Sequence, residues 1–203
     1  MPDTLTAAQP RSAEILDAVR SSFAEKGFDG ASMQDLAKAG GMSVGNFYRY
    51  FPSKAAIIEA LIARDLEAVG EDFARVITSP DPMQMLRDVL REHVEVKHCN
   101  EDFPLWAEIT AIAQRRPEIG AACGRMESEV RRYLLTIFSH ATGLPLAETE
   151  RRFVTHADFV VMLVSASAVQ PPDRRTGADE LTAMVLRTIN ATLDEVARSD
   201  VKG

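Results

Sequence analysis

Three potential metal ligands lie close together in this chain, namely His93, His98 and Cys99. Imidazole and thiolate groups are ligands that zinc prefers in proteins. His93 and His98 are five residues apart, however, whereas two ligands on one face of a helix need a spacing of four. The chain also lacks C-x-x-C and H-E-x-x-H motifs and a glycine-rich phosphate loop. A helical metal-binding protein or enzyme that uses these three residues is therefore kept only as the alternative, and we predict no catalytic site, metal site or cofactor.

A second stretch, SMQDLAKAGGMSVGNFYRYFPSK from Ser32 to Lys54, could bind a polyanion. The whole chain carries a net charge of −7, but no acidic residue lies between Leu36 and Ile58. Three basic residues do lie there, namely Lys38, Arg49 and Lys54. The local distribution of charge matters more for nucleic-acid binding than the total. This acid-free window is therefore compatible with a surface that faces phosphates, although a window of this length can also arise by chance.

The same stretch predicts two short helices that are joined by a glycine turn. Ser32 suits the N-cap of the first helix, and Asp35 makes a variant of the capping box with it. The glycine pair at 40–41 ends that helix. Ser43 caps the second helix, and Pro52 ends it because the residue before a proline disfavours the helical region.

Helical periodicity continues through the rest of the chain. Apolar residues recur at steps of three and four, and no segment alternates as a half-buried strand does. Proline and glycine separate the periodic segments, most clearly at 79–82. We therefore predict an all-α protein of about nine helices, with the longer ones at 11–26, 53–77, 83–97, 103–115, 118–140, 146–169 and 178–198.

The composition indicates a globular protein, since 46% of the 203 residues are apolar and 26% are charged. The most apolar run, 159–169, has about half of the ~20 residues that a membrane-spanning helix needs. The N-terminus does not have the pattern of a signal peptide. Two cysteines are too few for a disulfide framework. We expect a cytoplasmic protein with no membrane association.

The run G-x-S-x-G-x-F-Y-x-Y-F-x-S-K, from Gly41 to Lys54, is the most specific motif in the chain. With the residues before it, this run resembles the DNA-binding domain of TetR-family repressors over 11–62. The positions that carry the resemblance are Arg11, Ile15, Leu16, Ala18, Phe23, Gly27, Phe28, Ser32, Leu36, Ala37, Gly41, Ser43, Gly45, Phe47, Tyr48, Phe51, Ser53 and Lys54. Three positions depart from the family pattern: Gly40 replaces a common alanine, Val44 a common lysine, and Asn46 a small residue or threonine.

The resemblance implies a domain organisation. We expect a disordered N-terminal arm at 1–10, a three-helix helix-turn-helix DNA-binding domain at 11–62, and a larger helical ligand-binding and dimerisation domain at 63–203. The implied function is that of a transcriptional repressor that binds double-stranded DNA at a pseudo-palindromic operator. A small, mainly apolar effector would release it from that operator. A helical interaction module with a vestigial helix-turn-helix is a rival interpretation.

The reading helix is expected at 43–50, with its N-terminal end in the major groove. Asn46 could bond adenine bidentately or only touch a phosphate, and Val44 could meet a thymine methyl group or merely pack. Tyr48 and Lys54 could each contact a phosphate, the alternatives being a buried tyrosine and a solvated lysine. Gly45 would let the backbone approach DNA closely. The full set of expected DNA contacts is Ser32, Met33, Ser43, Val44, Gly45, Asn46, Tyr48, Arg49, Tyr50 and Lys54.

The resemblance also implies an effector pocket and a dimer interface in the C-terminal part. Apolar walls with a few polar anchors describe most binding cavities, but they equally describe an ordinary core. The pocket candidates are His93, Phe103, Trp106, Glu108, Ile109, Ile112, Met126, Tyr133 and Phe159. The helices at Leu146–Val169 and Ala178–Arg198 have more apolar surface than one core needs. We expect them to pair with a second copy in a homodimer, the alternative being burial within one subunit.

Overall fold

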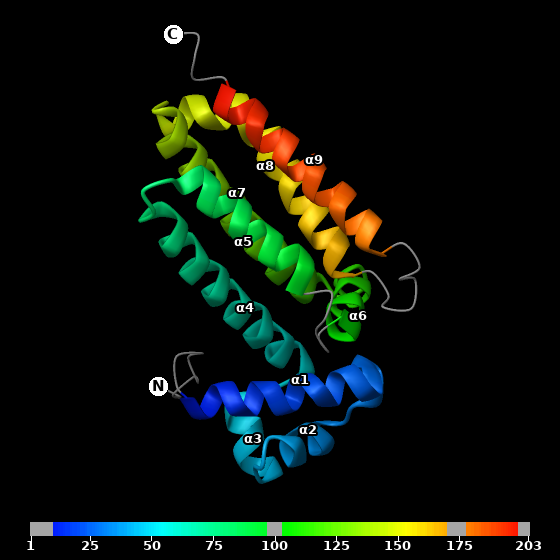
Figure 1. Ribbon diagram of the computed structural model, residues 1–203. Coiled ribbons are helices and arrows are strands. Elements are labelled where there is room, and N and C mark those ends of the chain that lie inside the picture. The colour runs from blue at the N-terminus through cyan, green and yellow to red at the C-terminus, as the bar shows by residue number, and fades with distance from the viewer. Residues whose placement is uncertain (1–9, 97–102, 170–177, 199–203) are drawn as a thin grey trace. The chain divides into compact units, whose positions relative to one another are not determined.

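The computed structural model describes residues 10–96, 103–169 and 178–198, and their regular structure is helical throughout (Figure 1). The all-α prediction is confirmed for this part of the chain. The helices described are α1 (Pro10–Gly30), α2 (Met33–Ala39), α3 (Val44–Tyr50), α4 (Lys54–Ile77), α5 (Pro82–Val96), α6 (Phe103–Ala113), α7 (Pro117–Thr142), α8 (Leu146–Ala168) and α9 (Ala178–Arg198). Among these elements, none is long and apolar enough to cross a membrane. The arm expected at 1–10 lies almost entirely outside the described residues, which begin at Pro10.

Helix α1 is broken at Gly27, directly after residue 26, where the sequence predicted that the helix ends. Gly27 has φ 70° and ψ 169°, a conformation that residues with a Cβ atom rarely adopt. The break turns Phe28 back into the protein, where its ring stacks on Phe23 with 5.9 Å between the ring centroids. The turn after α1 is therefore fixed both by backbone geometry and by an aromatic pair.

Contacts divide the chain into two compact units. The first comprises the chain up to Glu67 together with Pro104–Met126. Its core combines the N-terminal helices with α6 and the start of α7, and its largest fully buried side chains are Leu16, Phe23, Leu36, Phe47, Ile57, Ile58, Leu61, Leu105, Ile109 and Ile119. Each of these contributes roughly 1.5–3 kcal/mol by leaving water. The three-helix arrangement that positions α3 is thus stabilised by a shared core rather than by helix propensity alone.

The second unit comprises Ala68–Phe103 and Glu127–Gly203. In it α8 and α9 lie side by side, and α5 packs against both (Figure 1). Phe138 and Phe153 meet edge to face at the centre of its core. Arg87 connects α5 to α9, because its guanidinium group donates to the Asn190 side chain at 3.0 Å and to the Asp194 carboxylate at 2.6 Å.

The unit boundaries fall inside helices. Helix α4 belongs to the first unit up to Glu67, and α7 belongs to it up to Met126. The sequence prediction instead assigned everything after residue 62 to one C-terminal domain. That domain boundary stays a prediction, because grouping by contacts does not show which part folds or functions on its own.

Candidate nucleic-acid interface

Helix α2 begins at a complete capping box, which is formed by Ser32 and Asp35. The Ser32 hydroxyl accepts from the Asp35 amide at 3.1 Å, and the Asp35 carboxylate accepts from the Ser32 amide at 3.0 Å. Lys26, at the end of α1, forms an ion pair with Asp35 at 2.7 Å. These bonds, first the one from Lys26 and then those from Ser32, hold the pKa of the Asp35 carboxyl well below its ordinary value. The start of α2 is therefore firmly positioned by local side chains.

The apolar side of α3 packs against the core of the first unit. The hydroxyl of Ser43 accepts from the Asn46 amide at 3.4 Å and so caps the helix. Phe47 is fully buried and Phe51 nearly so, and their ring centroids lie 5.2 Å apart. The turn before α3 uses Gly41, whose φ is 66°. Both phenylalanines thus belong to the core of the first unit.

The opposite face of α3 projects into solvent. Val44 is 36% exposed and Tyr48 is 49% exposed, so neither side chain is buried within this chain. These residues are four apart and therefore share one face of the helix. Gly45 and Arg49 are exposed as well. The exposure of Tyr48 excludes the alternative that its side chain is buried. The exposure of Val44 argues against the alternative that its side chain only packs within the chain.

Gly45 has no structural reason to be glycine. A Cβ atom built at this position would have no neighbour within 4 Å. Its φ is not positive either, unlike that of Gly27, Gly41 and Gly143. An alanine would suit an exposed helical position better, because glycine has the lowest helix propensity after proline. The absence of a side chain here is compatible with a close approach by a partner.

Of the remaining residues of the expected set, Met33, Asn46 and Tyr50 are partly buried, whereas Ser32 and Ser43 are exposed. Met33 and Tyr50 pack against the core of the first unit, and Asn46 is half-buried. The side-chain amide of Asn46 has no hydrogen-bond partner among the described residues. Its donors and acceptor are therefore available to an outside partner. Ser32 and Ser43 are exposed, but both hydroxyl groups already serve as caps.

Lys54 has a role that the sequence did not predict. Its ammonium donates to the carbonyl of Phe28 at 2.6 Å and to the carbonyl of Asp29 at 3.3 Å, and it lies 4.8 Å from the centroid of the Phe28 ring. A lysine has three N–H donors, so one remains for a phosphate. The two carbonyl oxygens that accept from Lys54 lie more than twenty residues away in the sequence and belong to the backbone, so no sequence motif predicts these hydrogen bonds. The two exposed basic side chains of the acid-free window, Lys38 and Arg49, have no ion-pair partner in the part of the chain that the structure describes.

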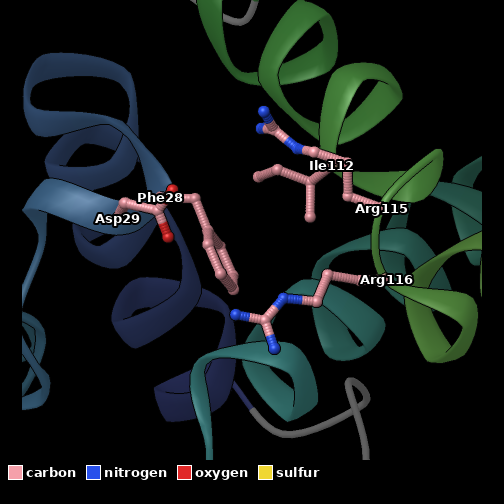
Figure 2. Close-up of a pocket in the computed structure, with 5 residues that line it drawn as sticks. All are labelled: Phe28, Asp29, Ile112, Arg115 and Arg116. Atoms are coloured by element: carbon pink, nitrogen blue, oxygen red, sulfur yellow. The ribbon is translucent and has the colours of Figure 1, made fainter.

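The expected effector residues are divided between the two units. Trp106, Glu108, Ile109, Ile112 and Met126 belong to the first unit, where Ile109 and Ile112 are core residues. The carboxylate of Glu108 accepts from the Phe28 amide at 3.0 Å. One pocket of about 270 Å³ lies in this unit, and Ile112 is its only lining residue from the expected set (Figure 2).

The other candidates lie in the second unit or at its edge. His93 bonds Asp72 at 2.8 Å, Tyr133 stacks on Phe73 with centroids 4.5 Å apart, and Phe159 is 37% exposed. Phe103 begins α6, but its side chain lies outside the described residues. The expected effector pocket therefore stays a prediction.

The structure describes only one of the three candidate metal ligands, His93. His98 and Cys99 lie outside the described residues. Within the described ranges, no group of three histidine, cysteine or acidic side chains could hold a metal ion. His93 is instead paired with an aspartate of α4.

Comparisons with known proteins agree with this geometry. Residues 15–61 match the profile of a family described as bacterial regulatory proteins, tetR family. This segment contains α2, α3 and the residues that form their caps. The HTH-type transcriptional regulator UidR of Escherichia coli K12 is 34% identical over 124 residues. The aligned region covers 60% of this chain and 61% of UidR, so the chain matches less than two thirds of that relative.

Solved structures share the fold over nearly the whole chain. GusR of Salmonella enterica superimposes with a TM-score of 0.73 at 23% identity, covering 96% of this chain and 98% of GusR. FadR of Bacillus subtilis, solved in complex with stearoyl-CoA, superimposes with a TM-score of 0.66 at 15% identity, covering 94% and 99%. At these identities the likeness establishes the fold alone.

Proposed function

We propose that this chain, which belongs to the tetR family of bacterial regulatory proteins through its residues 15–61, is a ligand-responsive transcriptional repressor. It binds operator DNA with α3, works as a homodimer, and leaves the operator when a small, mainly apolar effector binds. In this proposal the chain catalyses no reaction, and operator binding places it in the cytoplasm with the chromosome.

The observation that carries the proposal is the exposed face of α3. Val44, Tyr48 and Arg49 are exposed on it, and Gly45 leaves the backbone bare between them. Beside this face, the amides at the start of α2 and α4 and the cations of the acid-free window supply phosphate-binding groups. A surface that combines a bare helix start with unpaired cations suits the major groove of DNA.

Base recognition is assigned to the first turn of α3. The unpartnered amide of Asn46 can bond adenine bidentately, with a discrimination of roughly 1–3 kcal/mol against other bases. The exposed Val44 can contact the methyl group of a thymine. The phosphate contacts are assigned to Tyr48, Arg49 and the third donor of Lys54. Ser32, Met33, Ser43 and Tyr50 complete the proposed interface as residues at its edge.

Dimerisation is assigned to α8 and α9. Phe159 and Met162 of α8 are 37% and 55% exposed, and Leu181 and Met184 of α9 are 48% and 58% exposed. Each pair is three residues apart and therefore shares one face of its helix. Large exposed apolar side chains on two adjacent helices suit a four-helix interface with a second copy. The dimer would place two copies of α3 in successive major grooves, about 34–36 Å apart.

Effector control is supported by one contact within the first unit and by one solved relative. Glu108 of α6 accepts from the Phe28 amide, so a shift of α6 would move the turn that Lys54 also holds. The FadR of Bacillus subtilis was solved with stearoyl-CoA, a ligand with a long apolar chain. An effector lowers DNA affinity when it binds the conformation that does not fit DNA more tightly than the conformation that does, and the difference between these two binding free energies sets the size of the effect.

Salt-titrated binding to DNA from upstream of the chain's own gene tests the proposal. Fluorescence anisotropy is measured with that duplex and with a scrambled duplex of equal composition. We expect the native duplex to bind at least ~10³-fold more tightly at physiological salt, with an affinity that falls steeply as salt rises. If both duplexes bind alike at every salt concentration, the chain has no operator in that region and the repressor proposal fails for it.

A further inference from the structure

The carboxylate of Glu108 on α6 holds a turn that lies 80 residues earlier in the chain. Its Oε1 accepts from the Phe28 amide at 3.0 Å, and the bond is partly buried. Gly27 interrupts α1 directly before this amide, and a Cβ atom built at Gly27 would lie 3.4 Å from the same oxygen. A hydrogen bond to a charged acceptor is stronger than one between neutral groups. The carboxylate therefore fixes the chain directly at the break in α1.

Lys54 binds the same turn through its carbonyl groups. The ammonium donates to the carbonyl of Phe28 at 2.6 Å and to the carbonyl of Asp29 at 3.3 Å, and it lies 4.8 Å from the centroid of the Phe28 ring. The amide and the carbonyl of Phe28 are separated only by its Cα atom. Glu108 and Lys54 thus bind one residue, the first at its N–H and the second at its C=O.

The position of the Lys54 ammonium depends on this turn. A lysine side chain loses much conformational freedom when it is ordered. The two carbonyl groups already hold the ammonium in the free protein, so less freedom is lost when a phosphate binds its third N–H. This advantage lasts only while the carbonyl groups keep their place. Glu108 is the side chain that fixes the peptide group next to them.

We propose that Glu108 is a positioning residue for DNA binding: by holding the Phe28 amide, it places the two carbonyl groups that aim Lys54 at a phosphate. The inference rests on the proposed function, in which Lys54 contacts the DNA backbone. It requires no effector, so it is separate from the predicted effector contact of Glu108. Without this bond the phosphate contact should weaken on any DNA sequence, because phosphates carry no sequence information.

Charge alone predicts the opposite result for a substitution of Glu108. Removing a carboxylate makes the unit less negative, which should strengthen its attraction to DNA. Glu108→Ala should nevertheless weaken DNA binding by about tenfold, the size of one charge-assisted contact. Glu108→Gln keeps a side-chain oxygen that can accept from the Phe28 amide, so it should bind nearly as well as wild type. Glu118→Ala is the matched control and should not weaken binding, because Glu118 is an exposed glutamate of the same unit that does not bond the turn.

A double-mutant cycle with Lys54→Ala tests whether Glu108 acts through Lys54. Fluorescence anisotropy gives the affinity of full-length wild type, E108A, K54A and the double variant for the native upstream duplex and for the scrambled duplex, at low salt where both bind. Urea denaturation identifies a temperature at which every variant is folded. We expect E108A to weaken binding about tenfold when Lys54 is present and less than about twofold in the K54A background, on both duplexes. The slope of log affinity against log salt should fall in E108A towards that of K54A.

The cycle separates positioning from folding, because a merely destabilised unit would lose affinity to the same degree with or without Lys54. Additive losses, an E108Q variant as weak as E108A, or an E108A variant that binds as tightly as wild type would each overturn the inference. Equal affinity of wild type for the two duplexes would instead contradict operator recognition. The cycle would then still decide the role of Glu108 from the phosphate-driven binding that both duplexes share.

Discussion

Gly45 offers a clean separation between folding and DNA binding. A Cβ atom at this position meets nothing within 4 Å, and the backbone is not in a conformation reserved for glycine. Gly45→Ala should therefore fold normally. Its free energy of unfolding should rise, by at most about 1 kcal/mol, because alanine has the higher helix propensity. The gain is expected to be smaller than in a helix centre, since Gly45 is only the second residue of α3.

The effect on DNA affinity should have the opposite sign. If the backbone at Gly45 lies against the groove, an added methyl group overpacks that contact, at a cost of about 1–3 kcal/mol. This cost corresponds to a loss of roughly 5- to 150-fold in affinity for each half-site. Urea denaturation gives the change in stability, and anisotropy with the operator duplex gives the change in affinity. If the variant is more stable than wild type but binds the operator more weakly, unfolding cannot account for its loss of affinity.

Gly124→Ala is the matched control for that experiment. Gly124 lies within α7, is exposed, and would also have no neighbour within 4 Å of an added Cβ atom. The control should gain helix stability in the same way but leave DNA affinity unchanged. The close approach of DNA to Gly45 is refuted if G45A and G124A bind the operator equally well. A destabilised G45A would instead contradict the open space seen around this position.

Three further outcomes are expected. Lys54→Ala should lower the free energy of unfolding by about 1 kcal/mol, because it removes the hydrogen bond to the Phe28 carbonyl. It should also reduce the slope of log affinity against log salt by about one. Unchanged stability in urea would contradict the structural role of Lys54. Asp35→Asn should lower the melting temperature at pH 7, and the difference from wild type should shrink as pH falls below about 4. The reason is that the pKa of Asp35 is lowered in the folded state, so the stability that its carboxylate contributes is lost on protonation. A difference in melting temperature that stays constant down to about pH 2 would contradict this role of Asp35. Met184→Glu should yield a monomer in sedimentation that binds the operator weakly, and a stable dimer would move the interface elsewhere.

Local signals predicted the N-terminal elements well. The caps at Ser32 and Ser43 and the break at Gly27 depend on residues within a few positions of each other, so their types and spacing are visible in the sequence. Phe47 and Phe51 are four residues apart, a spacing that puts both on one face of a helix, and both are buried. The exposed face of α3 is then simply what remains when the apolar side is assigned to the core.

Contacts across long stretches of chain could not be predicted in this way. Glu108 bonds an amide 80 residues away, and Lys54 bonds a carbonyl 26 residues away. Any buried amide or carbonyl could in principle satisfy such a side chain, so residue type alone does not identify the partner. The effector candidates show the same difficulty, because a buried isoleucine such as Ile109 has a composition that suits a core and a pocket wall equally well.

Phe28 shows how these long-range bonds could matter for DNA binding. Its amide is held by Glu108, its carbonyl is held by Lys54, and its ring packs on Phe23 while lining the pocket. A single residue therefore connects α6 to the start of α4, the helix that follows α3. By contrast, the exposed residues of α3 take no part in any of these contacts. Under the proposed function, a change at Phe28 should therefore shift α3 as a body, whereas a change at Val44 or Tyr48 should alter only what α3 recognises.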